Sequence, residues 1–336
     1  MSRLTRIVAR AALTAVSIGV AGIGAEFSFR VLLERRYAAD AADFEHFLYE
    51  RDPAGEHLYR PRQGVERENE IAGTGGVTWS YRIDERGFRS GPPRSANEDA
   101  TRVVALGDSY TFGWAVEDAE AYPSALAREL DASADSVEVI NAGVPGFNTV
   151  QALSYLRERW NDLDPDVVVL GFVMNDAEPP RIAPIPPKIR YRYAPLWLLE
   201  DVKLWVDPSG TRLRSLLPRR RSYVDQFAEG TPERRACEEA FADLVELCGQ
   251  RGVPLLVYVF PDVTQFRPAG YSYRPIHELV LTWGERYGVP TVDLLPLLEG
   301  RSRDELWVPG DGHPNAESLA SMAERIAEDL RVLLNR

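Results

Sequence analysis

From about residue 100 onward, short apolar runs alternate with segments of helical periodicity, and this alternation constrains the fold more than any other feature. The runs are rich in Val and Leu on both faces, which is typical of strands buried in a parallel sheet. The predicted strands are 102–106, 137–141, 167–172, 255–260 and 291–294. The predicted helices are 120–130, 149–161, 233–250, 275–287 and 315–333. Because crossovers between parallel strands are right-handed, we expect an α/β fold, a three-layer α/β/α sandwich with a doubly wound parallel sheet.

The amino-terminal segment has the pattern of a membrane signal. Three arginines among the first ten residues precede an uncharged run over 11–25, which Glu26 ends. A positive region followed by an apolar stretch is typical of secretory segments, and the arginines would stay on the inner side of the membrane. We therefore expect residues 1–29 to be a signal anchor, a transmembrane segment. The rest of the chain would then lie outside the cytoplasm, in a bacterial periplasm or at the cell exterior.

An amino-terminal extension, residues 30–97, separates this anchor from the predicted sheet. Within it the segment 77–84 alternates strictly, with Trp79 and Tyr81 on the same side, which predicts a half-buried strand. The main domain is expected over 98–336.

Composition excludes several classes of function. The chain has 39 basic and 51 acidic residues, a net charge of −12, so most of its surface would repel a nucleic-acid backbone. The low count of four histidines and two cysteines argues against a multi-ligand zinc or iron–sulfur site. No phosphate-binding loop or dinucleotide fingerprint follows the first strand. We expect no nucleic-acid partner, no metal and no cofactor.

Chemically distinctive residues follow the first three predicted strands. Ser109 comes after the first strand, Gly143 after the second and Asn175 after the third. The carboxyl ends of parallel strands meet at one edge of the sheet, where ligands bind. A serine can supply a nucleophile, a glycine an unobstructed backbone N–H, and an amide a neutral donor to an oxyanion. Each residue also has a structural explanation, as a helix cap, a glycine-rich turn or an Asx turn.

A histidine follows the last predicted strand. His313 lies in a loop rich in Gly and Pro, and Asp311 precedes it by two residues. A carboxylate at that spacing can bend back to Nδ1 and hold the tautomer that a general base requires. The remaining histidines lie in polar helical or loop sequence and are not expected to be catalytic; they are His46, His57 and His277. A hydroxyl, an Asp–His pair and two hydrogen-bond donors are the set that acyl transfer needs.

Together these segments resemble the four sequence blocks of the SGNH (GDSL-type) hydrolases, over about residues 98–336. The matching segments are Gly107-Asp108-Ser109, Gly143, Asn175-Asp176 and Asp311-Gly312-His313. The resemblance implies a flavodoxin-like SGNH hydrolase fold. It also implies that Ser109 is the nucleophile, that His313 is its base and that Asp311 orients the imidazole. The oxyanion hole would comprise the N–H groups of Ser109 and Gly143 and the side chain of Asn175.

The chain departs from the common family pattern at two positions. The usual Asp three residues before the His is replaced by Gly310, and the acid is Asp311. This spacing is similar to the Asp-x-His arrangement of SGNH-like polysaccharide O-acetyltransferases and esterases. The usual Gly two residues before the Asn is Val173, where no side chain is required. No Gly-x-Ser-x-Gly elbow surrounds Ser109, which argues against an α/β-hydrolase fold.

An insert of about residues 177–232 follows Asn175. Long excursions inside a compact domain are often lids or binding loops, and this one leaves the strand that carries Asn175. Its aromatic residues would contact a sugar or lipid substrate, or the insert is a surface loop with its own small core. The candidates for substrate contact are Tyr191, Tyr193 and Trp197.

The sequence thus predicts a membrane-anchored, extracytoplasmic serine esterase or lipase-type hydrolase that acts on carboxylic esters. A short acyl or O-acetyl group on a small molecule or glycan is the expected substrate. A polysaccharide O-acetyltransferase that uses the same site is one alternative, because the two reactions differ only in what enters the second step. A catalytically silent envelope binding protein is the other alternative.

Overall fold

A computed structural model describes most of the chain beyond its amino-terminal segment. The described residues are 48–52, 57–70, 78–91, 97, 99–130, 137–180, 222–267 and 270–334. The predicted signal anchor, His46 and the three aromatic residues of the insert lie outside these residues. Within them, no helix has both the length and the apolar character required to cross a membrane.

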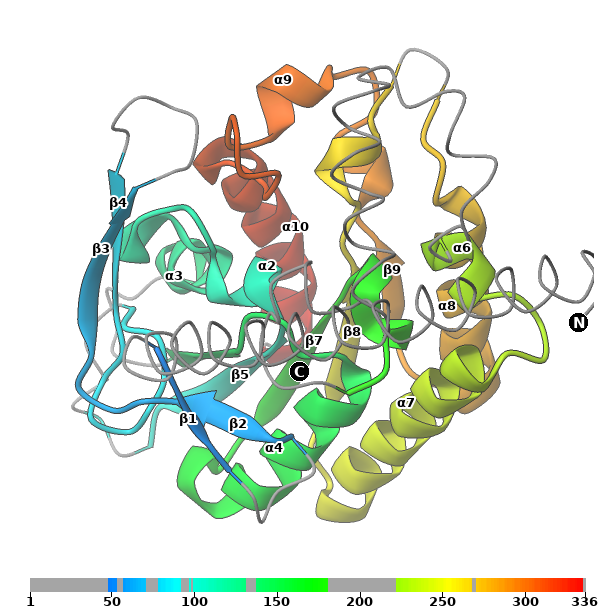
Figure 1. Cartoon of the computed structure of the whole chain (residues 1–336). Coiled ribbons are helices and arrows are strands. Elements are labelled where there is room, and N and C mark those ends of the chain that lie inside the picture. Colours follow the sequence, from blue (N-terminus) through cyan, green and yellow to red (C-terminus); the bar gives the residue numbers. More distant parts are fainter. Residues whose placement is uncertain are drawn as a thin grey trace, which may run out of the picture. The chain divides into compact units, whose positions relative to one another are not determined.

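The centre of the domain is a parallel five-stranded sheet with the order β6-β5-β7-β8-β9 (Figure 1). Its strands are β5 (Thr101–Gly107), β6 (Val137–Gly143), β7 (Val167–Phe172), β8 (Leu255–Val259) and β9 (Thr291–Asp293). They match the five predicted strands, and every residue of β7 and β8 is buried. This order is the flavodoxin-like one, in which the direction of winding reverses between β5 and β7, and a ligand site is expected at the carboxyl ends of these two strands.

Helices cover both faces of this sheet, so the predicted three-layer sandwich is confirmed. The α-helices are α2 (Ser109–Phe112), α3 (Tyr122–Glu129), α4 (Thr149–Leu163), α6 (Tyr223–Gln226), α7 (Pro232–Arg251), α8 (Arg274–Tyr287), α9 (Arg303–Leu306) and α10 (Ala316–Leu334). Short 3₁₀ helices are η1 (Asp118–Glu120), η3 (Met174–Ala177), η5 (Val263–Gln265) and η6 (Leu295–Leu297). Helix α3 packs against α10 and helix α4 against α7, and the two pairs lie on opposite sides of the sheet (Figure 1).

Helix α10 shows how the apolar periodicity of the sequence builds the core. Its residues at helical spacing are buried, and they are Leu319, Met322, Ala323, Ile326 and Leu330. Removing a Leu or Ile side chain from water contributes about 1.5–3 kcal/mol, so one face of this helix holds it on the sheet.

The described part of the amino-terminal extension forms two antiparallel pairs. Strand β1 (Tyr49–Arg51) pairs with β2 (Tyr59–Pro61), and β3 (Glu66–Glu70) pairs with β4 (Thr78–Arg82). The predicted strand near 77–84 is confirmed as β4, in which Trp79 and Tyr81 are buried while Thr78 and Arg82 are exposed. By its contacts the described part of the extension belongs to the same compact unit as the sheet.

Gly143, the last residue of β6, lies directly against helix α2. A Cβ atom at Gly143 would come within 2.7 Å of the carbonyl carbon of Thr111 and closer still to the backbone nitrogen of Phe112. Backbone atoms cannot turn aside as a flexible side chain can, so glycine is the residue that allows the helix to sit this close to the sheet.

We predict that Gly143→Ala lowers the free energy of unfolding by about 1–3 kcal/mol, because the helix or the strand must shift. Gly249 in α7 is the matched control, since a Cβ there meets nothing within 4 Å. Gly249→Ala should be neutral or stabilise by about 0.5–1 kcal/mol. Urea denaturation of the two variants measures the difference, and equal stabilities would contradict the tight packing at Gly143.

Candidate active site

Ser109 is the first residue of α2, where the chain leaves the carboxyl end of β5. The Asp108 carboxylate caps this short helix by accepting a hydrogen bond of 2.8 Å from the Tyr110 N–H. Gly113 ends the helix with a φ of 83°, and its N–H donates to the Ser109 carbonyl. The local sequence therefore assigns the capping role to Asp108, and the Ser109 hydroxyl is left available for other contacts.

The structure brings Ser109, His313 and Asp311 together. The Ser109 Oγ atom lies 2.9 Å from His313 Nε2, although the two residues are 204 positions apart in the sequence. On the other side of the ring, His313 Nδ1 is hydrogen-bonded to Asp311 Oδ1. This arrangement can transfer the hydroxyl proton to the imidazole while the carboxylate fixes the ring.

The turn that carries Asp311 and His313 explains why the acid is not at position 310. Gly310 and Gly312 have φ values of 86° and 100°, a region that favours glycine. The turn is closed by a 2.8 Å bond from the Val308 N–H to the His313 carbonyl. The chain thus curls so tightly that a carboxylate two residues before the histidine reaches Nδ1.

Trp114 holds the second oxygen of the same carboxylate. Its indole Nε1–H donates to Asp311 Oδ2 at 3.2 Å, and its ring centre lies 6.3 Å from that of His313. Burial raises the pKa of Asp311, but the hydrogen bonds from His313 and Trp114 and the attraction to the imidazole outweigh burial, so the pKa lies below its usual value. Asp311 is therefore an anion over the range in which esterases work. Nothing in the sequence pattern pointed to Trp114.

Asn175 reaches the site from η3, which follows β7. Its Nδ2 atom donates to Asp108 Oδ2 at 3.0 Å, and the Ser109 hydroxyl lies 3.2 Å from the same oxygen. A serine has one hydroxyl hydrogen, so it can donate either to Asp108 or to His313, and the shorter distance is to His313. Burial raises the pKa of Asp108 despite the hydrogen bonds that it accepts.

Gly143 also lies beside helix α2, but its N–H donates within the protein. The acceptor is the Asn141 side-chain oxygen at 3.1 Å, and the Asn141 amide donates in turn to the Phe112 carbonyl. The structure therefore places Gly143 where it was expected and gives it a packing role, while its part in an oxyanion hole stays a prediction.

The described histidines other than His313 lie in the core. His277 is fully buried, with Nδ1 2.6 Å from Asp293 and Nε2 3.0 Å from the Tyr271 hydroxyl. His57 is also fully buried, with Nδ1 3.3 Å from Ser154. Both lie in enclosed polar networks, and neither forms a hydrogen bond with Ser109, His313 or Asp311 in the described part of the chain.

One cluster of possible metal ligands occurs in the described part of the chain, formed by Asp52, His57 and Glu158. The guanidinium of Arg60 already lies 3.6 Å from the Asp52 carboxylate and 4.0 Å from that of Glu158. A cationic side chain thus balances both carboxylates, and we assign these residues to an ion-pair network.

The model of the GDSL-like Lipase/Acylhydrolase family matches residues 105–318, more than half of the chain. The chain therefore belongs to this family and is an ester hydrolase. A search of curated proteins gave no match.

Several solved structures are similar to this chain at low sequence identity. The psychrotrophic esterase EstA from Pseudoalteromonas sp. is 15% identical with a TM-score of 0.44, over 70% of this chain and 100% of that chain. A lipase/acylhydrolase from Enterococcus faecalis is 19% identical with a TM-score of 0.43, over 68% and 95%. AlinE4, an SGNH-hydrolase family esterase, is 16% identical with a TM-score of 0.40, over 71% and 99%.

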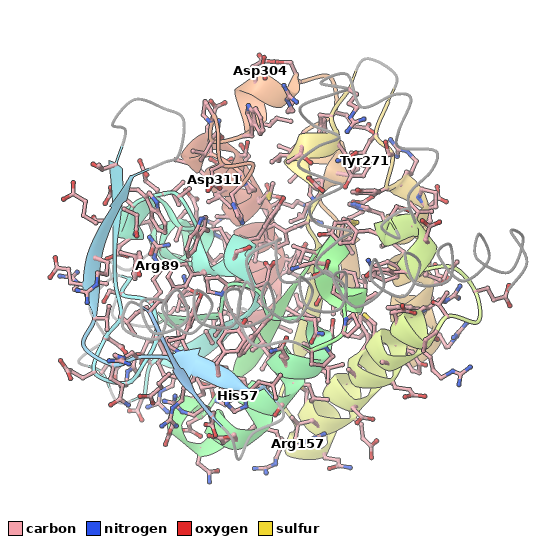
Figure 2. All side chains as sticks on the ribbon, viewed as in Figure 1. His57, Arg89, Arg157, Tyr271, Asp304 and Asp311 are labelled. Carbon is pink, nitrogen blue, oxygen red and sulfur yellow. The ribbon has the colours of Figure 1, made fainter. Side chains whose placement is uncertain are left out.

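Substitutions at Asp311 and Asp304 test which carboxylate orients the His313 imidazole. Asp304 lies on α9, is largely exposed and pairs with its neighbour Arg303, whereas Asp311 lies lower in the view (Figure 2). We predict that Asp311→Asn lowers kcat by about 10²–10⁴-fold, because the amide no longer holds the imidazole in its charged form. Asp304→Asn should stay within about twofold of the wild type. The reverse order in steady-state ester hydrolysis would contradict the role of Asp311.

Asp176 fixes the short helix that carries Asn175. Its carboxyl group accepts bonds of 2.6 Å from the Val173 N–H and 2.7 Å from the Thr149 hydroxyl. Burial raises its pKa from 3.8 to about 8. The folded protein therefore keeps a proton that the unfolded chain loses, and the contribution of this group is complete below pH 3.8 and is lost as the pH rises toward 8.

We predict that this group makes the free energy of unfolding fall by up to roughly 1.4 kcal/mol per pH unit between about pH 4 and 8. Asp176→Asn does not titrate, so its unfolding free energy should fall less steeply over that range. The exposed Asp304→Asn serves as the control and should keep the wild-type slope. Urea denaturation at several pH values measures the slopes, and identical slopes for Asp176→Asn and the wild type would refute the effect.

Proposed function

We propose that the protein is a serine esterase that hydrolyses carboxylic esters through Ser109, His313 and Asp311. The observation that carries this proposal is the continuous path of hydrogen bonds from the Ser109 hydroxyl through the imidazole to the Asp311 carboxylate. Membership of the GDSL-like family supports the same reaction class.

In the first step His313 Nε2 accepts the hydroxyl proton as Ser109 Oγ attacks the ester carbonyl carbon. The Asp311 carboxylate stabilises the imidazolium that forms and keeps its Nδ1–H in place. The imidazolium then gives the proton to the leaving alcohol, and an acyl-enzyme ester remains on Ser109. A water molecule then attacks the acyl carbon while His313 takes one of its protons. The bond between the acyl carbon and Ser109 Oγ breaks, the imidazolium returns the proton to Oγ, and the carboxylic acid leaves.

Two donors would stabilise the negative oxygen of the tetrahedral intermediate, the Ser109 N–H and the Asn175 side-chain amide. Ser109 is the first residue of α2, so its own N–H has no acceptor within the helix. The Asn175 amide group has two N–H bonds, of which one is directed to Asp108. The Gly143 N–H would join them if it released the Asn141 side chain. A neutral donor favours the transition state because the charge on the oxygen develops there.

We extend the proposal to the location and the substrate. The arginine-flanked apolar run over 11–25 supports an anchor at the membrane with the domain outside the cytoplasm. The acyl group would be short, an O-acetyl group on a small molecule or glycan, and the insert aromatics would contact its sugar ring. The Asp-x-His spacing also supports a second candidate, transfer of that acyl group to a sugar hydroxyl from the same acyl-enzyme.

The purified full-length protein should hydrolyse p-nitrophenyl acetate, and Ser109→Ala should lose at least about 10³-fold in kcat/KM. Ser321→Ala, on α10, is the matched control and should leave the rate unchanged. A fluorophosphonate should label Ser109, as mass spectrometry of the labelled peptide would show. An active Ser109→Ala protein would reject the nucleophile, and a folded wild type that resists the label would favour the binding protein.

Incubation with an acetylated glycan and a free sugar acceptor distinguishes the two candidate reactions. Hydrolysis releases acetate in proportion to the ester consumed. Transfer yields an acetylated acceptor, and its detection would show that the protein is an acyltransferase rather than a hydrolase.

A further inference from the structure

The amino-terminal extension contacts the chain segment that follows the nucleophile helix. Arg89 lies between the β3–β4 pair and α2 (Figure 2), is only 2% exposed, and forms an isolated backbone bridge with Asn141 of β6. It is thus a cation enclosed by protein, and such a side chain is costly to bury unless its charge and its N–H groups are all matched.

The partners of Arg89 are the backbone oxygens at the end of α2 and in the turn after it. Its Nη1 atom donates to the Phe112 carbonyl at 2.8 Å and also to that of Gly113, while Nη2 donates to the Val116 carbonyl at 2.7 Å. The Asp118 carboxylate lies 2.9 Å from Nε and balances the charge.

These contacts compensate for a weakness of α2. A helix of four residues leaves its last carbonyl groups without intrahelical donors, and it gains little stability from its own hydrogen bonds. A cation at the carboxyl end of a helix is also electrostatically favourable. Arg89 therefore supplies from the extension what the helix with Ser109 cannot supply itself.

A second contact of the extension reaches Asp311 through Trp114. Trp79 on β4 is buried and meets the Trp114 ring edge-to-face, with 5.0 Å between the ring centres. The Arg89 guanidinium lies 5.6 Å from the Trp79 ring centre and 4.6 Å from that of Phe112. Trp114 donates its indole N–H to Asp311 Oδ2. Because Trp79 packs against the Trp114 ring, the extension orients the indole that makes this hydrogen bond.

We propose that Trp114 and Arg89 are positioning residues for catalysis and that the extension is a structural part of the active site. Trp114 holds the Asp311 carboxylate in line with His313 Nδ1, and Arg89 holds the end of the helix that starts at Ser109. This inference rests on the proposed roles of Ser109, His313 and Asp311.

Trp114→Phe tests the indole donor in the full-length protein, because it keeps the aromatic ring and removes one N–H. We expect kcat for p-nitrophenyl acetate to fall about 10–100-fold with KM changed less than about threefold. The pH profile of kcat/KM should also shift, because the hydrogen bond to Oδ2 sets how the Asp311 carboxylate faces the imidazole. Trp160→Phe, a buried indole on α4, is the matched control and should change neither quantity.

Arg89→Lys tests the second residue, since it keeps the charge and loses the planar fork of donors. The rate of fluorophosphonate labelling at Ser109 should fall at least fivefold while the protein stays folded by circular dichroism. Arg86→Lys, at a half-exposed arginine of the same extension, is the control and should label at the wild-type rate.

Proton NMR gives a readout that does not depend on ester hydrolysis. The low-field resonance of the His313 Nδ1–H is assigned by its loss in Asp311→Asn, and Trp114→Phe should shift it whereas Trp160→Phe should not. Wild-type kcat, pH profile and resonance in Trp114→Phe would overturn the positioning role and leave the proposed function intact. A shifted resonance with an active Ser109→Ala protein would instead reject the proposed function, and with it any catalytic role for Trp114.

Discussion

The hydrogen bond between the Ser109 hydroxyl and the His313 imidazole joins two segments that strand pairing alone does not hold at contact distance. Ser109 follows β5, the second strand of the sheet, and His313 lies in a tight glycine turn beyond the opposite edge strand β9. A contact of 2.9 Å between them requires both the short helix and the turn to be held within a fraction of an ångström. Much of the surrounding structure can be understood as meeting this requirement.

On the serine side the requirement is met by close packing. Helix α2 rests on Gly143 without room for a methyl group, and Asp108 caps it while also accepting the Asn175 amide. Hydroxyl, cap and amide donor are therefore linked through one buried carboxyl group. On the histidine side, two glycines at positive φ bend the loop so that Asp311 faces the ring.

The elements of the sheet were predictable because strands buried on both faces leave an unmistakable apolar pattern, and β7 with its flanking Asn175 is the clearest case. The proximity of Ser109 and His313 could be predicted because both follow strand ends, which the topology brings to one edge of the sheet. Trp114 and Arg89 could not be predicted, since their partners are fixed by how the extension packs and no spacing encodes that packing. The buried states of His57 and His277 were missed for the same reason, because polar neighbours in sequence are not neighbours in space.

The match to the family begins at residue 105, yet side chains from Trp79 and Arg89 reach the centre of the molecule. The residues that match the family therefore do not include all the residues that pack around Ser109 and Asp311. A shortened gene that starts after Arg89 and before β5 would keep every strand of the parallel sheet and would remove the guanidinium donors from the carbonyls of Phe112 and Val116. Such a truncation would also expose the rings of Trp114 and Tyr155, against which Trp79 and Phe88 of the extension pack.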